Sequence, residues 1–315
     1  MRATVLISTR NRRDELPGAI ESCLMQREAV KILVADDGST DGTSEMVAAR
    51  YPQAELVRFE SPLGIVGVRN AVLARIRTPF FFTLDDDAKF STPDVAGDTL
   101  AEFDHPRVAV VTIPLVNFIG GKRVNEAWRP PAGGGVYAVS HFRGGANCMR
   151  LSAFTEAGGY RTLFHRQGEE SDLTMRLMNI GYIARLGNAD EVHHFPSPTR
   201  NLPEIRFHTA RNSLLMAAQL VGFPLVLVQM GGVGAVQTRA GLRDSLLWPA
   251  VRGLGAGLVA AVRHWPERKP VSGTVYRRVR QMGGTGWIRL EELERELPPL
   301  RRATTGAEAV AVSGA

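Results

Sequence analysis

Hydrophobic and polar positions along the first hundred residues fall into blocks that predict strands and helices in turn. Four short apolar runs predict strands, at residues 3–8, 30–38, 54–60 and 79–84. Between the first two runs, Leu16, Ile20 and Leu24 follow one another at helical spacing, and further helices are expected before the third and fourth runs. This alternation is typical of a mostly parallel sheet with helices on its faces. We therefore expect an α/β fold.

Polar residues follow three of the predicted strands at the point where each strand ends. They are Thr9 to Arg12, Asp36 with Asp37, and Asp85 to Asp87. In sheets of this type ligands bind at the carboxyl ends of the strands, where the strand order reverses. This recurrence is the strongest sign of a binding site that the residues themselves give.

The acidic run Asp85-Asp86-Asp87 follows the fourth strand, whose continuous apolar residues predict burial in a parallel sheet. Because side chains at i and i+2 share one face of an extended chain, Asp85 and Asp87 are expected to converge while Asp86 turns away. Close carboxylates repel one another unless a cation lies between them, and Mg²⁺ or Mn²⁺ accepts such oxygen ligands. A solvated acidic turn is the alternative, and the run alone does not decide between the two.

Two unusual segments follow the first hundred residues. Residues 117–142 are rich in glycine and proline and predict a long, irregular functional loop. Its Trp128 and Tyr137 could stack on a bound ligand, or could simply anchor the loop. Residues 212–238 carry no charge, and with the next apolar segment they predict paired helices over 212–262. These helices are expected to pack on the rest of the protein or to make a peripheral membrane contact, with a membrane-spanning helix as the alternative.

Composition and charge narrow the classes of protein. The 315 residues, 44% of them hydrophobic, can bury a large core in one big domain or two unequal ones. The net charge is +6, but no basic cluster alternates with aromatic residues, so no nucleic-acid partner is expected. The N-terminus begins with a predicted strand and shows no signal peptide. We expect a cytoplasmic protein, associated with the inner face of the membrane if 212–262 is interfacial.

Four motifs occur in order over the first ninety residues: STRNR, VADDGSTDGT, GIVGVRN and LDDDA. Together they resemble the family 2 glycosyltransferases, and the resemblance continues in RGGAN (143–147) and GEESDLTMRL (168–177). It implies the GT-A fold, a Rossmann-like, mostly parallel sheet flanked by helices, with a C-terminal helical region. The implied division is a catalytic domain over 1–205, with a nucleotide-sugar half to about 115 and an acceptor half from about 116, then a helical region over 206–298 and a disordered tail over 299–315.

The resemblance also implies roles for residues of the donor half. Thr9, Arg10 and Asn11 stand where the family cradles the ribose and the base edge. Asp36 matches the acid that binds the pyrimidine ring, and Arg69 the basic residue above it; a turn with helix-capping carboxylates is the alternative for Asp36. Asp85 and Asp87 match the Asp-x-Asp motif, which holds the ribose and a Mn²⁺ or Mg²⁺ ion. The family commonly places a histidine facing this metal, and we favour His194 over His193.

For the acceptor half, the resemblance places a general base at Glu170, with Glu169 as the rival. Gly145, Ala146 and Asn147 match a small-residue segment beside the reacting centre, for which an ordinary tight turn is the alternative. Trp128 is the candidate aromatic contact to the acceptor. Asp172 and Arg176, four residues apart on the same predicted helix, could simply form an exposed ion pair.

The implied activity is inverting, metal-dependent transfer of a sugar from a nucleotide-diphosphate sugar, with UDP- and dTDP-sugars favoured. The acceptor would be a hydroxyl of a glycan, a lipid-linked glycan or a small molecule. A sugar nucleotidyltransferase is one alternative, but it would need a glycine-rich phosphate loop after the first strand, and STRNRRDEL contains no glycine. The other alternative is a degenerate family member that binds nucleotide or glycan without turnover.

Overall fold

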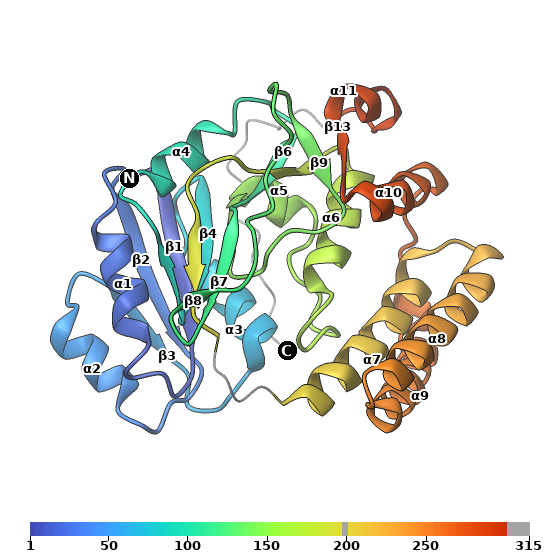
Figure 1. Ribbon diagram of the computed structural model, residues 1–315, viewed down its shortest axis with the longest axis horizontal. Coiled ribbons are helices and arrows are strands. Elements are labelled where there is room, and N and C mark those ends of the chain that lie inside the picture. Colours follow the sequence, from blue (N-terminus) through green and yellow to red (C-terminus); the bar gives the residue numbers. More distant parts are fainter. Residues whose placement is uncertain (197–200, 301–315) are drawn as a thin grey trace.

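The computed structural model describes residues 1–196 and 201–300, apart from the side chains of residues 284 and 285. Figure 1 shows a layered α/β body, with a group of helices from residue 202 onward lying beside it. Of the predicted tail, residues 301–315 lie outside the described residues.

A mixed sheet of nine strands forms the centre of the described part of the chain. In spatial order it contains β13 (Trp287–Arg289), β9 (Tyr137–Val139), β11 (Ile183–Leu186), β6 (Val108–Thr112), β10 (Ala146–Arg150), β4 (Phe80–Asp85), β1 (Ala3–Thr9), β2 (Val30–Asp36) and β3 (Glu55–Arg58). The four strands predicted from the apolar runs are confirmed as β1 to β4, and they pair in parallel with one another. β10 runs antiparallel to β4 and β6.

Helices cover both faces of this sheet. One face carries α1 (Leu16–Leu24), α2 (Thr43–Arg50) and α4 (Val95–Ala101), and the other carries α3 (Gly64–Leu73), α5 (Leu151–Glu156) and α6 (Glu169–Asn179). Successive residues of β1 divide between the two layers: Val5 and Ile7 pack with α1, whereas Leu6 packs with α3. The strands are therefore buried on both sides, which explains their continuous apolar runs.

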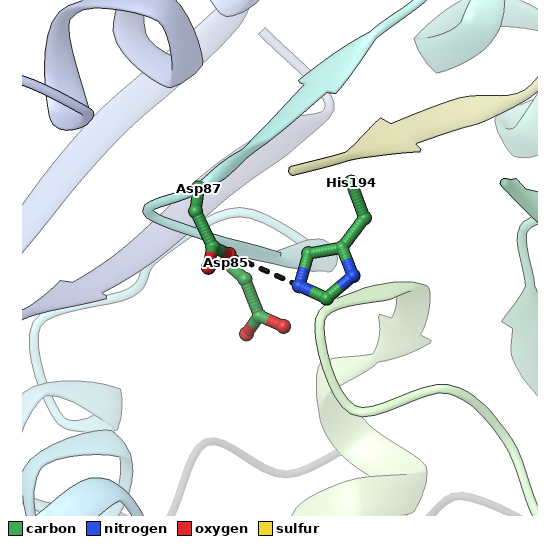
Figure 2. A group of neighbouring side chains, drawn as sticks. All are labelled: Asp85, Asp87 and His194. Atoms are coloured by element: carbon green, nitrogen blue, oxygen red, sulfur yellow. Dashed lines mark ion pairs between the residues drawn. The ribbon is translucent and has the colours of Figure 1, made fainter. Parts of the chain in front are cut away.

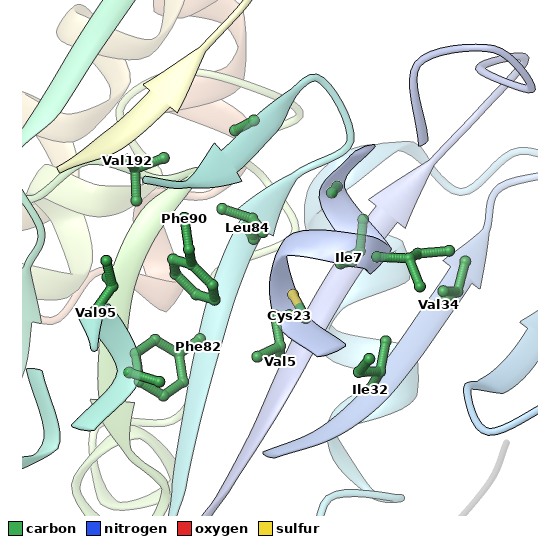
Figure 3. Close-up of a cluster of buried hydrophobic side chains, with 14 of the residues drawn as sticks. Val5, Ile7, Cys23, Ile32, Val34, Phe82, Leu84, Phe90, Val95 and Val192 are labelled. Carbon is green, nitrogen blue, oxygen red and sulfur yellow. The ribbon is translucent and has the colours of Figure 1, made fainter. Parts of the chain in front are cut away.

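Figure 3 shows the layer on the α1 side, where Val5, Ile7 and Cys23 lie beside Phe82 and Leu84 of β4. Phe82 also packs edge-to-face on Phe90, with ring centroids 5.8 Å apart. Phe90 belongs to a second, smaller sheet, so this core joins the two sheets and fixes the turn between them, which holds the acidic run.

The second sheet has the order β5 (Ala88–Phe90), β12 (Val192–His194), β7 (Leu115–Ile119) and β8 (Lys122–Arg123). β12 pairs antiparallel with β5, so that His194 lies opposite Ala88. The backbone N–H of Phe195 donates to the carbonyl oxygen of Asp87 at 2.8 Å. This pairing places a histidine from late in the chain beside the acidic run.

The C-terminal helices are α7 (Leu202–Leu220), α8 (Leu225–Arg243), α9 (Leu247–Arg263), α10 (Gly273–Thr285) and α11 (Leu290–Leu293), with short 3-10 turns at Trp265–Glu267 and Glu294–Glu296. α7 and α9 approach closely because glycines face α7: a Cβ at Gly257 would lie 2.7 Å from the carbonyl oxygen of Arg211. No helix in residues 1–196 or 201–300 is long and apolar enough to cross a membrane.

The prediction of an irregular loop over 117–142 is wrong in part. Residues Tyr137–Val139 form β9, a fully buried strand of the main sheet that pairs with β11 and β13. Tyr137 is packed edge-to-face on Trp287, with ring centroids 4.8 Å apart. The strand has three residues, too few for its periodicity to stand out after a glycine run.

Candidate active site

The carboxyl ends of the parallel strands bring the predicted polar residues together. In the strand register Thr9 lies beside Asp36, and Ser8 lies beside Asp85. A cavity of about 410 Å³ opens at this edge of the sheet. Its walls are formed by Ser8, Thr9, Arg10, Arg12, Asp37, Ile65, Val68, Asp85, Asp86, Asp87, Arg166 and His194.

Asp85, Asp87 and His194 form a group whose ligand atoms all lie within 4.8 Å of one another (Figure 2). His194 Nε2 lies 3.1 Å from Asp87 Oδ1, the contact drawn dashed in the figure. Asp85 comes from the end of β4, Asp87 from the turn before β5 and His194 from the end of β12. Two carboxylates and one imidazole can hold a divalent metal ion.

A second contact fixes the ring of His194. Its Nδ1 lies 2.6 Å from the side-chain oxygen of Asn117 on β7. Because an amide oxygen only accepts, Nδ1 is the donor in this contact, and Nε2 is the ring nitrogen that faces Asp87. The neighbouring His193 points elsewhere: it packs against Phe118, with ring centroids 4.8 Å apart.

The middle carboxyl of the acidic run differs from its neighbours. Burial raises the pKa of Asp86 to about 7, and the negative charges of Asp87 and Asp85 push it in the same direction. Asp86 lines the cavity but does not belong to the group of possible metal ligands. The predicted split between Asp86 and the two flanking carboxylates agrees with this arrangement.

The side chains of Asp36 and Asn11 form hydrogen bonds with the turn that follows β2. The Asp36 carboxylate accepts hydrogen bonds from the Ser39 N–H (2.8 Å) and from the Ser44 hydroxyl, and its side chain is fully buried. Asn11 Oδ1 accepts from the Thr40 N–H at 2.8 Å. Neither residue lines the cavity, whereas the adjacent Asp37 does.

Gly144 and Gly145 are required by close approach to two carboxylates. A Cβ at Gly145 would overlap the carboxylate of Asp85, and one at Gly144 would overlap Oε1 of Glu170. Arg69, from α3, lies close to both carboxylates. Its guanidinium donates to Asp85 Oδ1 at 3.3 Å and also faces Glu170. The carboxylates of Asp85 and Glu170 therefore contact two consecutive residues of the backbone, Gly145 and Gly144.

Glu169 and Glu170 open α6, where carboxylates are favoured by the helix dipole. Burial raises the pKa of Glu170 to about 8, and the charge of Glu169 adds to the effect. Burial also raises the pKa of Glu169. Glu169 is only 4% exposed, whereas Glu170 is half-buried. Of the two, Glu170 has the more accessible side chain.

The ion pair of Asp172 and Arg176 is present, but the expectation that it is exposed is wrong. The two side chains approach to 2.7 Å in the interior, and Asp172 is fully buried. Arg161 also contacts Asp172, at 3.3 Å. Arg176 in turn donates to the carbonyl oxygens of Ala157 and Gly159, the former at short range and the latter at 2.7 Å. Residues of the preceding turn thus surround the pair and exclude water.

The other residues predicted to contact an acceptor are Ala146, Asn147 and Trp128. Ala146 and Asn147 are fully buried, and the Asn147 amide donates to Thr83 Oγ1 and to the Arg143 carbonyl, both at 2.6 Å. Trp128 stacks on His141, with ring centroids 5.5 Å apart. Ala146 and Asn147 therefore belong to strand β10 and not to a tight turn, and Trp128 packs within its loop. Their role toward an acceptor stays a prediction.

Arg12 and Asp37 belong to the polar groups that the sequence places at the strand ends, but no role of their own was predicted for them. Ser8, Ile65, Val68 and Arg166 line the cavity and were not singled out from the sequence. Asp37 also accepts from the N–H groups of Leu63 (2.6 Å) and Gly64 (3.0 Å), and so fixes the start of α3. Arg166 lies in the irregular turn before α6, where neither periodicity nor motif distinguishes it.

Residues 4–166 match the family model described as Glycosyl transferase family 2. The succinoglycan biosynthesis protein ExoU of Rhizobium meliloti (strain 1021) is 33% identical over 101 residues, which span 31% of this chain and 29% of that protein. An N-acetylglucosaminyl-diphospho-decaprenol L-rhamnosyltransferase of Mycobacterium tuberculosis is 26% identical over 214 residues, covering 54% of this chain and 68% of that protein.

Solved structures share the fold at low identity. A mannosyltransferase, PcManGT from Pyrobaculum calidifontis in complex with GDP-Man and Mn²⁺, has a TM-score of 0.55 at 17% identity, over 84% of this chain and 87% of that one. S. aureus TarS 1–349 in complex with UDP-GlcNAc has a TM-score of 0.56 at 15% identity, over 89% and 92%. With the flanked central sheet, these likenesses confirm the predicted GT-A fold.

Proposed function

The chain belongs to glycosyl transferase family 2, and we propose that it moves a sugar from a nucleotide-diphosphate sugar to an acceptor hydroxyl with inversion at the anomeric carbon. One observation carries the proposal: a cavity at the strand ends holds a possible metal group on one side, and Asp85 within that group shares the Gly144-Gly145 segment with Glu170. Donor phosphate and acceptor hydroxyl would thus meet across this short segment.

Asp85, Asp87 and His194 are the residues that would hold the metal. Their two carboxylates and one imidazole suit Mn²⁺ or Mg²⁺, and the nitrogen ligand favours Mn²⁺. When bound, the ion would neutralise the charge that develops on the departing diphosphate. Arg10, Arg12 and Arg166 also line the cavity and would bind the phosphate oxygens directly.

Glu170 is the proposed general base. Its carboxylate would take the proton of the acceptor hydroxyl while the hydroxyl oxygen forms its bond to the anomeric carbon. The bond from that carbon to the diphosphate oxygen breaks at the same time, and its electron pair leaves with the nucleoside diphosphate. Attack from the side opposite the leaving group inverts the carbon, by the geometry that inverting glycosidases use.

The donor and acceptor are proposed as classes. UDP- or dTDP-sugars remain the favoured donors, since Asp36 stands where the family binds a pyrimidine ring. For the acceptor, we favour a lipid-linked glycan over a free glycan or a small molecule, because the mycobacterial relative is named for a decaprenol-linked substrate. A cytoplasmic protein working at the inner face of the membrane would fit this acceptor.

The first test is thermal stabilisation of the full chain by UDP, dTDP, GDP and ADP, each with and without Mn²⁺. A ligand at about a hundred times its Kd adds ~2.7 kcal/mol to the free energy of unfolding, which is roughly 4 °C in Tm for a chain of this size. We expect a pyrimidine-selective shift that requires the metal. Asp87→Ala should abolish it, whereas the exposed control Asp98→Ala should keep it.

Turnover separates a transferase from a binding module that lacks activity. Glu170→Gln should lower kcat by about 10² to 10⁴ while donor binding persists, because a general base acts only in the chemical step. Glu169→Gln is the matched control and should retain turnover. If Glu169→Gln loses activity and Glu170→Gln does not, the base is Glu169. If neither wild type nor any variant turns over a sugar nucleotide that it binds, the binding-module alternative holds.

A further inference from the structure

An apolar stripe runs along the outer side of α9. It contains Trp248, Val251, Leu258, Val259 and Val262, whose successive spacings of three, seven, one and three residues keep all five on one side of a helix. All five side chains are exposed; Trp248 and Val259 are each 70% exposed and Val262 is 68% exposed. Large apolar side chains exposed in a row, and not singly, mark an interaction surface.

The same surface character continues on α8 and on the turn before it. Val228 is 73% exposed, and Phe223, Leu227 and Leu242 are exposed to a similar degree. Figure 1 shows α8 and α9 at the edge of the molecule, on the side away from the main sheet. The buried sides of these helices pack on each other and on α7, so the apolar outer sides have no partner within the described residues.

Charge is distributed very unevenly between this region and the rest of the chain. Residues 206–285 contain eleven Arg or Lys residues and two carboxylates, a formal charge of +9, whereas the whole chain carries +6 and the remainder therefore −3. Arg252 and Arg263 follow Val251 and Val262 in α9, so they flank the apolar stripe on one side, and both are exposed. At an anionic lipid surface their guanidinium groups would lie at the level of the lipid phosphates.

We propose that the outer face of α8 and α9 docks on an anionic lipid bilayer. The apolar side chains would enter the boundary between headgroups and acyl chains, and the arginines would bind lipid phosphates. Each arginine would add its own electrostatic contribution to the binding free energy. A second copy of this chain fits less well, because residues 206–285, which include this face, carry a formal charge of +9 in each copy, and like charges repel. The inference rests on the membrane location proposed above but not on sugar transfer.

Vesicle binding tests the surface directly. The full chain would be floated with vesicles of phosphatidylcholine alone and of phosphatidylcholine mixed with phosphatidylglycerol, at low and high salt. We expect binding that requires phosphatidylglycerol and weakens with salt, together with a blue shift of tryptophan emission as Trp248 leaves water. Arg263→Gln should lower the affinity about fivefold, the effect of one basic residue at an anionic surface. Arg77→Gln, exposed elsewhere on the molecule, is the charge-matched control.

The apolar component has its own matched pair. Val259→Asp should abolish flotation, whereas Val124→Asp, at an exposed valine outside the helices, should not. Equal binding to both vesicle types, no binding to either, or a dimer in solution that Val259→Asp dissociates would overturn the proposal. The donor-induced Tm shift, measured on the same variants, should be unchanged, so failure of the membrane surface is distinguishable from failure of the transferase assignment.

Discussion

At the scale of single residues, the site depends on what Gly144 and Gly145 lack. Neither needs a left-handed backbone, since neither has a positive φ. Both are needed because Asp85 and Glu170 occupy the space that a Cβ would take. Small size at these positions therefore sets where the metal-side carboxylate and the proposed base can stand.

Gly145→Ala should displace Asp85 and abolish metal-dependent stabilisation by nucleotide. Gly144→Ala should instead displace Glu170, leaving nucleotide binding intact and lowering kcat by about 10²-fold, the cost of misplacing a reacting group by about 1 Å. Gly234→Ala is the control, because open space surrounds that glycine of α8. Equal effects of the two loop substitutions on binding and turnover would show that the loop simply unfolds.

The raised pKa of Glu170 predicts a specific pH dependence of stability. Its ordinary pKa of 4.5 rises to about 8 on folding, first by burial and then by the charge of Glu169. The folded protein therefore holds this proton more tightly, and the stabilisation is complete below about pH 4.5 and is lost as the pH rises through about 8. Denaturant unfolding without metal or nucleotide should show this loss in wild type, and Glu170→Gln should reduce it. Burial also raises the pKa of Glu169 and of Asp86, so these two groups account for the part that remains. A parallel pH profile in the two proteins would contradict the assignment.

The same residues show how far a sequence leads. Asp85 and Asp87 could be paired from their i, i+2 spacing, since alternation along an extended chain is local geometry. The choice of His194 over His193 depends on which face β12 turns toward β5, a long-range pairing. The hydrogen bonds of Asp36 with Ser39 and Ser44 depend on the shape of a turn. The sequence is the same whether that carboxylate faces the turn or the cavity.

At the scale of elements, a buried charge cluster fixes α6. Asp172 binds Arg176 and Arg161, and the turn they hold contains Tyr160, whose N–H and carbonyl oxygen bond to Asn70 of α3. The cluster thus ties the helix that carries the proposed base to the helix that carries Arg69.

Asp172→Asn should lower the free energy of unfolding by about 3 kcal/mol or more, because it leaves two buried guanidinium groups without their carboxylate. The matched control is Glu55→Gln, which removes a carboxylate from the exposed pair with Arg75 and should cost less than about 1 kcal/mol. Equilibrium urea unfolding measures both. Similar costs for the two variants would mean that the buried cluster does not hold the helix.

Close packing of α7 and α9 gives a second prediction at this scale. Gly253→Ala would push a methyl group into the carbonyl oxygen of Phe207 and should destabilise the protein by about 1–3 kcal/mol. Gly255→Ala lies in the same helix with nothing within 4 Å, and should stabilise it by about 0.5–1 kcal/mol through helix propensity. Opposite signs of the change in Tm are expected, and a Tm that rises in both would refute the close approach.

Sequence periodicity finds elements only when they are long enough to repeat. α1 and β1 to β4 have several apolar positions each, and they were predictable. β9 has three residues and owes its place to pairing with β11 and with β13, a partner about 150 residues later in the chain. Such an element is defined by its neighbours, so its own residues carry almost no signal.

At the scale of the whole molecule, the hydrophobic core crosses the predicted boundary at residue 205. One buried cluster combines Val108, Val111 and Ile183 of the catalytic body with residues of the C-terminal region, namely Leu220, Val271, Val275, Met282, Leu290, Leu293 and Leu297. β13 extends the main sheet from the same region. The division into domains remains a prediction, but these contacts predict that the two parts fold together.

A chain that ends at residue 205 should therefore lose the cooperative thermal transition of the full protein and expose the apolar faces of β6 and β11. Burial of seven large apolar side chains from the C-terminal region, at about 1.5–3 kcal/mol each, is as large as the whole ~5–15 kcal/mol by which proteins are usually stable. A chain ending at Leu300 keeps every member of the cluster and is the control, with an unchanged transition expected. Calorimetry on the three lengths decides the matter. If the 205-residue chain melts cooperatively and still binds nucleotide with Mn²⁺, the catalytic body is an independent domain and the shared cluster is only an interface.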